Sequence, residues 1–406
     1  MHLQELQWTR RGMAALIGVI SAAFISGIFV GLSSDSIYDG MFVPMGRFNI
    51  AAAGDWGCGI GAVNTVSNMK PQDPDVVLAL GDLSYEGSSE KIGSICGDTS
   101  SWFDIVNPII KRMLFVIGNH DLPKSTVVPD LLKQYQEKFK LCKFGKCDNF
   151  YARDKEGVHF LIMNSEEEYP IKRTGAQYSA VEADLKAASS NPSIKWIIVA
   201  FHTPMYASYN NIVWVLSGWM PHFHVNYNDF VKNFREVYHP LFDKYGVDLV
   251  LQGHAHNYQR TYPLVFDSRT EPALVEIPLN KPPLVTSTAK DTYVNPSGEI
   301  YLTVGTAGVS LDGVSPLEDN NFILDPGGGD KTITDDHFFA KVNDTDFGFL
   351  DLELSEDKSS LTGIFYSNDA PARTSINESR VPPVGSFHGF PTMGHKVIDY
   401  FTIKHS

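Results

Sequence analysis

The sequence predicts an α/β fold in which sheets lie between helices, and two patterns lead to this prediction. Short apolar runs recur along the chain, and segments with apolar residues three and four positions apart lie between them. The runs are apolar at nearly every position, which is typical of strands that are covered on both faces. Strands that alternate with helices in this way indicate an α/β domain.

The expected elements follow one another over most of the chain. Strands are expected at 48–55, 75–82, 112–121, 158–165, 194–202, 247–256 and 299–308. Helices are expected at 128–140, 178–189 and 228–245. The Gly- and Asp-rich segment 325–336 is expected to be an exposed loop. Three further strand-like pieces, FGFLDLELS, LTGIFYS and VIDYFTIK, are expected to complete the edge of a sheet.

Composition and charge exclude one class of partner. The 406 residues are 43% hydrophobic and 20% charged, as in a folded globular protein, and the net charge is −14. No basic run is longer than a pair. Because binding to a phosphate backbone needs clustered Lys and Arg, we expect no nucleic-acid partner. The sequence makes no prediction about oligomeric state.

Residues 12–32 carry no charge and are long enough to cross a bilayer. Arg10 and Arg11 precede this run and acidic residues follow it, which predicts that the remainder of the chain lies outside the cytoplasm. A buried core helix is the alternative interpretation. The length of the run favours a retained anchor over a cleaved signal peptide, whereas the paired arginines also allow an export signal.

We therefore expect a signal or anchor segment at 1–32, a linker at 33–46 and one domain at 47–406. The domain is expected to be either anchored to a membrane or secreted. Glycosylation acceptor patterns begin at Asn343 and Asn377 and agree weakly with this location.

The four cysteines also agree with an extracytoplasmic location, because thiols tend to pair there. Cys142 and Cys147 flank a Gly-containing turn, so a hairpin bridge is expected. This would leave Cys58 to pair with Cys96, although the other two connectivities stay open. A four-thiolate zinc site is disfavoured because the sequence contains no C-x2-C pair.

Polar residues directly follow five of the expected strands. Ligands bind beyond the carboxyl ends of strands in open α/β sheets, so we expect these residues to converge. They are Asp55, Asp82, Tyr85, Asn119, His120, Asp121, His202, His254 and His256. Each motif alone is commonly a turn, a helix N-cap or an exposed loop, and it is the ordered set that indicates a site.

The set is suited to binding metal ions. Three carboxylate or phenolate oxygens, one amide oxygen and three imidazoles make seven ligands, which are too many for one ion and suit two ions that share a bridge. Hard anionic oxygens favour a hard or trivalent ion, and imidazoles favour iron, zinc or manganese.

The blocks GDWG, GDLSY, GNHD, AFHTP and GHAH resemble those of the calcineurin-like metallophosphoesterases, and more narrowly those of the purple acid phosphatases. The resemblance covers roughly residues 46–310 and implies a four-layer α/β/β/α sandwich with two mixed sheets. Many superfamily members carry a histidine where this chain has Gly57, and purple acid phosphatases supply a tyrosine instead, as at Tyr85. The missing imidazole and the added phenolate agree with each other and favour Fe(III).

By this resemblance each ligand has a role. A ferric ion would be held by Asp55, Tyr85 and His256, and a divalent ion, Fe, Zn or Mn, by Asn119, His202 and His254, with Asp82 as the bridge. His120 would bind the substrate phosphate or protonate the leaving group, and Asp121 could orient it. The resemblance thus implies an extracytoplasmic acid phosphatase that hydrolyses phosphate monoesters with a metal-bound hydroxide as nucleophile.

The match to the family is incomplete in one block. The family usually supplies a further histidine some ten residues after the one at 202, where this chain reads SYNN. His222 or His224 could fill this role from a longer loop. The third block ends in Asp rather than Glu, as in the shorter mammalian form.

Other interpretations stay open. One is a phosphodiesterase or nucleotide hydrolase on the same fold, and another is a surface-anchored binding protein whose metal site is not catalytic. Four aromatic residues could line the mouth of the pocket or belong to the core: Trp56, Tyr206, Tyr209 and Trp219.

Overall fold

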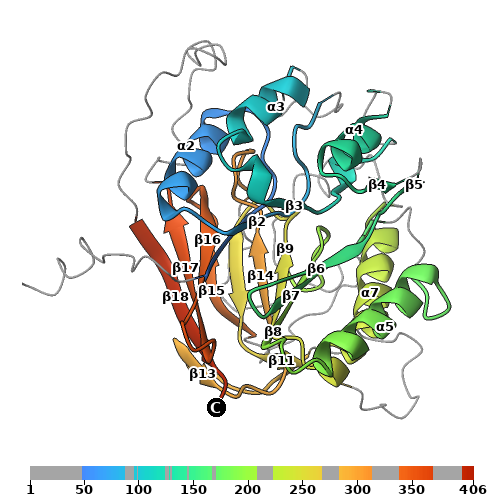
Figure 1. Ribbon diagram of the computed structural model, residues 1–406, viewed down its shortest axis with the longest axis vertical. Helices are drawn as coiled ribbons and strands as arrows, with labels where there is room; N and C mark the ends of the chain where they lie inside the picture. Colours follow the sequence, from blue (N-terminus) through green and yellow to red (C-terminus); the bar gives the residue numbers. More distant parts are fainter. Residues whose placement is uncertain are drawn as a thin grey trace, which may run out of the picture. The chain divides into compact units, whose positions relative to one another are not determined.

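Two seven-stranded mixed sheets form the centre of the computed structural model (Figure 1). The structure describes residues 48–86, 96–97, 99–123, 128, 130–143, 146–166, 171–207, 223–267, 283–312, 338–368 and 396–406. The first sheet has the order β13 (Thr292–Val294), β18 (Lys396–Lys404), β17 (Ser360–Ser367), β16 (Gly348–Leu354), β1 (Phe48–Ala53), β2 (Val76–Ala79) and β3 (Met113–Phe115). The second has the order β15 (Phe339–Asn343), β10 (Tyr258–Thr261), β14 (Ile300–Val304), β9 (Leu249–Gln252), β8 (Trp196–Ala200), β7 (Val158–Ile162) and β6 (Tyr151–Lys155).

Helices and short pieces complete the described part of the chain. The α-helices are α2 (Ile60–Met69), α3 (Thr99–Val106), α4 (Leu131–Lys138), α5 (Ala176–Ser189) and α7 (Phe223–Tyr245). Three 3₁₀ turns are η1 (Lys70–Gln72), η2 (Ile110–Arg112) and η3 (Asn119–Asp121). Two small ladders pair β4 (Cys142–Lys143) with β5 (Lys146–Cys147), and β11 (Leu264–Val265) with β12 (Leu284–Val285).

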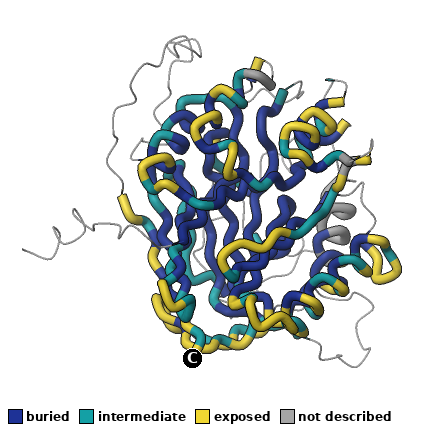
Figure 2. Tube along the Cα trace, viewed as in Figure 1, coloured by how far each residue is buried: buried dark blue, intermediate teal, exposed yellow. Residues whose placement is uncertain are grey.

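Three hydrophobic clusters order these elements in layers. The first lies between the sheets, where Ile50 and Ala52 of β1 meet residues such as Ile198 of β8. The second packs α2, α3 and α4 on the outer face of the first sheet, and the third packs α5 and α7 on the outer face of the second. Neighbouring residues of one strand therefore enter different cores, since Ala51 and Ala53 face the helices. The central strands of both sheets are buried, as Figure 2 shows, which explains the continuous apolarity of their sequences.

The predicted α/β class with two mixed sheets is confirmed, and each of the seven predicted apolar runs contains a strand. The three predicted helices are present as α4, α5 and α7, while α2 and α3 were not predicted. The tail strands were expected at the edge of a sheet, and this detail is wrong. β16 pairs with β1 inside the first sheet, and β13 forms the edge next to β18.

The N-terminal segment at 1–32, the linker at 33–46 and the loop at 325–336 lie outside the described residues. Among the residues that are described, no helix is long and apolar enough to cross a bilayer. The division of the chain into anchor, linker and domain stays a prediction.

The predicted bridge between Cys58 and Cys96 is confirmed. Cys142 is disulfide-bonded as well, and Cys147 lies opposite it in the ladder of β4 and β5. Both observations agree with the hairpin bridge that the sequence predicts. Asn343, at the start of one glycosylation pattern, ends strand β15.

Candidate metal centre

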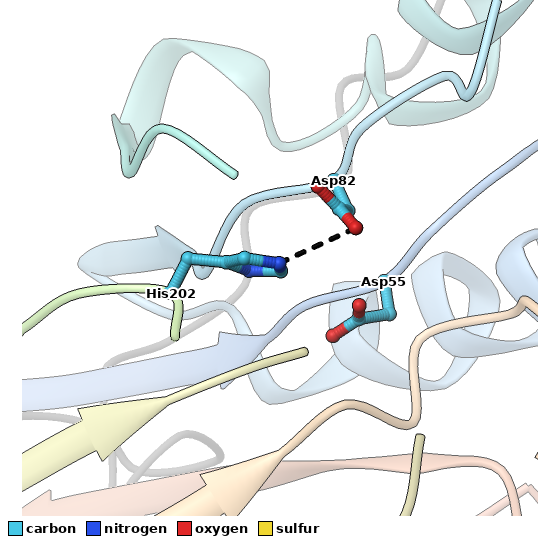
Figure 3. Close-up of side chains that lie close together, drawn as sticks. All are labelled: Asp55, Asp82 and His202. Atoms are coloured by element: carbon cyan, nitrogen blue, oxygen red, sulfur yellow. Dashed lines mark ion pairs between the residues drawn. The ribbon is translucent and has the colours of Figure 1, made fainter. Parts of the chain in front are cut away.

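The carboxyl ends of parallel strands from both sheets carry the predicted ligands into one place. Asp55 follows β1, Asp82 follows β2 and Asn119 follows β3 in the first sheet. His202 follows β8 and His254 follows β9 in the second sheet. The site therefore bridges the two sheets, at the edge where ligands bind in open α/β sheets. Figure 3 shows the side chains of Asp55, Asp82 and His202 pointing toward one another.

Three atoms that could bind a metal ion form a first group at this edge. The hydroxyl of Tyr85 donates to Oδ1 of Asp55 at 3.1 Å and lies 3.1 Å from Nε2 of His256. The same His256 nitrogen lies 3.3 Å from Oδ1 of Asp55. Ligands that bind one ion at about 2 Å are separated from one another by about 3 Å. The three atoms are thus spaced as the ligands of a single ion.

A second group of three donor atoms lies beside the first. Oδ1 of Asn119 is 3.1 Å from Nε2 of His202 and 2.8 Å from Nδ1 of His254. The two imidazole rings are nearly perpendicular, with centroids 5.3 Å apart. These nitrogens and the amide oxygen have the separations that a second ion would require.

Asp82 interacts with both groups. One of its carboxylate oxygens lies within 4.8 Å of one of Asp55 in the first group, and its Oδ2 lies 3.3 Å from Nε2 of His202 in the second. Its Oδ1 accepts the backbone N–H of His120 at 2.8 Å. Burial raises the pKa of Tyr85 well above its usual value, and the negative charges of Asp82 and Asp55 raise it further. Burial by itself raises the pKa of Asp82, yet the charges of His202 and His120 hold it well below its usual value. The carboxylate that can bridge the two groups is therefore kept ionised.

Backbone carbonyl groups fix the orientation of two imidazole rings. Nδ1 of His202 lies 2.7 Å from the carbonyl oxygen of Leu80, and Nδ1 of His256 lies 2.8 Å from that of Ser310. A carbonyl oxygen can only accept a hydrogen bond, so each Nδ1 carries a proton and donates it. In the neutral ring, Nε2 then directs its lone pair toward the space between the candidate ligands, as in most metal-binding histidines.

Four predicted ligands have left-handed backbone conformations. Their φ angles are 62° at Asp55, 52° at Asp82, 53° at Tyr85 and 68° at His254. Such conformations are uncommon outside glycine, and they persist where the surrounding structure imposes them, often at functional sites. The strand-end loops of this site are therefore strained at the residues whose side chains converge.

Two glycines leave room for these loops. A Cβ on Gly118 would overlap both Oδ1 and the backbone nitrogen of Asp82. A Cβ on Gly253 would lie 2.6 Å from the carbonyl oxygen of Leu80 and 2.9 Å from Oδ2 of Asp55. The glycines of GNHD and GHAH thus allow the strand-end loops to approach the carboxylates closely.

The carboxylates of the site attract positive charge. Burial lowers the pKa of His256 by itself, yet the carboxylate of Asp55 raises it to about 9. His202 behaves in the same way, because Asp82 raises its pKa well above the usual value against the effect of burial. The pKa of His254, by contrast, is lowered to about 3 by burial and by the charge of His202. A pocket that draws protons onto two of its imidazoles has the potential that a cation requires.

His120 and Asp121 have different positions in the site. The ring of His120 is 11% exposed, stacks at a tilt against Tyr85 with centroids 4.4 Å apart, and places Nε2 3.9 Å from Oδ2 of Asp82. The carboxylate of Asp121 instead accepts backbone N–H groups of Asp82, Gly118 and Leu83 at 3.0, 2.9 and 3.1 Å. These bonds make Asp121 a clamp between two ligand loops, and its role in orienting His120 stays a prediction.

The sequence did not identify the residues behind His202. Ser165 Oγ accepts the backbone N–H groups of His202 at 3.2 Å and Thr203 at 2.7 Å. Oε1 of the buried Glu166 accepts the hydroxyl groups of Ser165 and Thr203 at 3.1 and 3.0 Å. Both residues lie within four positions of the end of β7, so the strand-end rule that identified the candidate ligands could have identified them too.

The aromatic residues proposed for the pocket mouth belong in part to the core. Trp56 is fully buried in the cluster beneath α2, and Tyr206 is buried beneath α7. Tyr209, Trp219 and His222 lie outside the described residues, as does the side chain of His224. A further histidine near the site therefore stays a prediction.

Comparison with known proteins identifies relatives of this chain. The calcineurin-like phosphoesterase family model matches residues 48–258, more than half of the chain. Purple acid phosphatase 23 of Arabidopsis thaliana is 25% identical over 302 residues, covering 68% of this chain and 55% of the relative. Acid phosphatase type 7 of Danio rerio is 26% identical over 243 residues, covering 58% and 49%. The chain spans about half the length of the curated relatives that it matches.

A solved structure supports the same fold. The purple acid phosphatase PPD1 from seeds of yellow lupin (Lupinus luteus) superposes with a TM-score of 0.60 at 20% sequence identity. The match covers 88% of this chain and 54% of the lupin chain.

Proposed function

Because the chain belongs to the calcineurin-like phosphoesterase family, we propose that it is an acid phosphatase that hydrolyses phosphate monoesters with two metal ions. One observation carries the proposal. Two groups of three donor atoms, each spaced for a single ion, lie side by side, and Asp82 interacts with both. The similarity to purple acid phosphatases supports the same activity.

The donor set fits a ferric and a divalent ion. Asp55, Tyr85 and His256 would hold Fe(III), because a phenolate and a carboxylate are hard anionic ligands. Asn119, His202 and His254 would hold Fe(II), Zn or Mn, with Asp82 as the bridge. When bound, the two ions supply Lewis acidity toward the phosphate and lower the pKa of a water molecule.

The residues of the chain provide the remaining functions. The ring of His120 is close to the proposed bridge and is partly exposed, so it can meet a phosphate that arrives from solvent. An imidazolium there would donate a hydrogen bond to a phosphoryl oxygen or a proton to the leaving group. Asp121 holds the loops of Asp82 and Gly118 and thereby positions the bridge.

We place the enzyme outside the cytoplasm, either anchored or secreted. The disulfide between Cys58 and Cys96 supports this location, because such bonds form in oxidising compartments. The proposed anchor or signal at 12–32 would supply the means of export.

The first test is the visible absorption spectrum of the oxidised, iron-loaded protein. We expect a broad visible band from Tyr85 on Fe(III) that disappears in Tyr85→Phe. Tyr258→Phe is a matched control, because Tyr258 is also buried and its hydroxyl donates to a carboxylate, Oδ2 of Asp399 at 2.7 Å, away from the ligand set. This variant should keep the colour.

Activity is measured on the same samples with a monoester and a diester substrate. Monoester turnover at acid pH with a coloured protein supports the whole proposal. A colourless, metal-loaded and active protein would refute the proposal of a ferric ion. Preferred turnover of the diester would refute the proposal that the enzyme is a monoesterase. Failure to bind iron, zinc or manganese would refute the enzyme.

A further inference from the structure

A second set of metal-binding side chains lies beneath α7, outside the ligand set described above. His239 and Asp243 are one turn apart on α7, and Glu299 directly precedes β14. One ligand atom from each of the three lies within 4.8 Å of the others. Glu299 is at the amino end of its strand, whereas the ligands of the metal centre follow carboxyl ends.

Each of these three residues presents a buried polar atom that has no hydrogen-bond partner among the described residues. These atoms are Nε2 of His239, Oδ1 of Asp243 and Oε2 of Glu299. The side chains of His239 and Glu299 are fully buried. Nε2 of His239 lies 3.1 Å from Oε1 of Glu299, which is an ion-pair distance, and makes no hydrogen bond of good geometry. An unpaired buried polar group is costly, and here three lie together.

The other polar atoms of the same side chains are engaged, which fixes their orientation. Nδ1 of His239 lies 2.8 Å from the hydroxyl of Tyr206. Oε1 of Glu299 accepts the hydroxyl of Tyr301 at 2.6 Å. Oδ2 of Asp243 accepts a backbone N–H from the loop after β11 at 2.9 Å. Each residue is thus held by one atom and presents another, as metal ligands with a supporting outer shell do.

The two carboxyl groups of the cluster face at most one positive charge, that of a protonated His239. The cluster contains two carboxyl groups and one imidazole, and no Lys or Arg in the described part of the chain forms an ion pair with Asp243 or Glu299. Burial raises the pKa of Glu299, which shows the cost of its negative charge at this position. A divalent ion would offset that charge.

We propose that His239, Asp243 and Glu299 bind one divalent cation of the zinc class, at a site separate from the metal centre. Zinc accepts imidazole nitrogen and carboxylate oxygen at about 2 Å, so its ligands are about 3 Å apart. Nε2 of His239 is 3.7 Å from Oδ1 of Asp243 and 3.1 Å from the Glu299 carboxylate at Oε1, the oxygen that also accepts the Tyr301 hydroxyl, and ligand atoms of the three residues lie within 4.8 Å of one another. Asp243 is 24% exposed and gives the ion access from solvent.

The ion would hold together α7, the start of β14 and, indirectly, the loop that contains Tyr206. Two of its ligands belong to α7 and the third to the start of β14. Through the bond between His239 and Tyr206, it would also support the loop that begins at His202. The proposed site therefore has a structural role, behind a loop of the metal centre.

The test counts zinc ions per chain in the purified full-length protein. The protein is stripped with a chelator, dialysed against zinc, passed through a desalting column and measured by mass spectrometry. We expect Glu299→Gln to hold one zinc fewer than the wild type. Asp243→Asn should show the same loss, and its partly exposed side chain keeps the test available if the buried variant does not fold.

A matched control separates a metal site from an ordinary buried ion pair. His159 also lies between two carboxylates, but its Nδ1 bonds Asp154 at 2.6 Å and its Nε2 bonds Asp184 at 2.8 Å. His159→Gln should leave the zinc count unchanged. In an Asp82→Ala background, which disables the metal centre, Glu299→Gln should still remove one further zinc. Equal zinc counts in Glu299→Gln, Asp243→Asn and the wild type would overturn the proposal, whatever the state of the metal centre.

Discussion

Replacement of Asp121 by alanine should cost more stability than its position beside His120, the proposed catalytic residue, suggests. The carboxylate is fully buried and accepts the backbone N–H groups of Asp82, Gly118 and Leu83. Alanine accepts no hydrogen bond, so the variant leaves all three N–H groups without a partner. The three N–H groups that lose their acceptor belong to the loops that follow β2 and β3.

The magnitude follows from these three bonds. A buried N–H without a partner costs about 1–3 kcal/mol, so three cost at least about 3 kcal/mol. Water that enters the space left by the carboxylate recovers part of the loss, and we expect about 3–5 kcal/mol. A typical domain has a net stability of about 5–15 kcal/mol, so the variant should be folded but clearly weakened.

Denaturant unfolding of the metal-free protein measures this free energy. Asp357→Ala is the control, because Asp357 also accepts three hydrogen bonds, from Ser355 Oγ at 2.7 Å and from the N–H and hydroxyl of Ser359 at 3.1 and 2.8 Å. That carboxylate is exposed, so water can replace it as an acceptor and little change is expected. Equal effects of the two substitutions would refute the clamp. Phosphatase activity lost without a change in stability would instead support the role beside His120 that the sequence suggested.

Three other substitutions test the structure. Gly118→Ala should reduce metal content and stability, because its Cβ overlaps the carboxylate of Asp82, while Gly97→Ala, which meets no atom within 4 Å, should change neither. The double variant Cys58→Ser, Cys96→Ser removes a cross-link between residues 38 positions apart and should lower the free energy of unfolding by about 4 kcal/mol. An unfolding midpoint of the wild type that stays unchanged when its disulfide is reduced would contradict this. Burial lowers the pKa of His159, but its two aspartate partners raise it overall, so its stabilising effect is complete below its unfolded pKa of about 6.5. That stabilising effect should disappear as pH rises through the higher pKa of the folded state. A difference in the free energy of unfolding between His159→Gln and wild type that grows with pH would contradict this.

The strands could be predicted because their signal is local. Each core strand is buried on both faces, so its own residues, such as those around Ile50 and Ile198, carry continuous apolarity. Helix α2 was missed because its ten residues, IGAVNTVSNM, mix buried polar and apolar side chains. Both Thr65 and Asn68 face the core, where Thr65 donates to the carbonyl group of Ala307 and Asn68 to the side-chain oxygen of Asn368. Those partners lie far away in sequence, so no local pattern reveals them.

The candidate ligands could be predicted for a similar reason, whereas their support could not. A polar residue directly after an apolar run is visible in the sequence, as at Asp55 and His202. The contacts that orient the ligands join distant strands: Leu80 holds His202, and Ser310 holds His256. The clamping contacts of Asp121 could not be predicted for this reason, because its backbone partners at positions 82 and 83 follow another strand.

The backbone, rather than the ligand side chains alone, determines the shape of the candidate metal centre. Left-handed conformations at Asp82 and His254 turn the chain so that each side chain faces the other sheet, and such conformations cost free energy unless their surroundings impose them. The clamp by Asp121 and the close approach at Gly118 act on the loop of Asp82, and the N–H of His254 donates to Oδ2 of Asp55 at 2.9 Å. All of these contacts join protein groups, so the chain itself contributes to holding the ligand loops in place. Loops held in this way keep the groups that they carry in position.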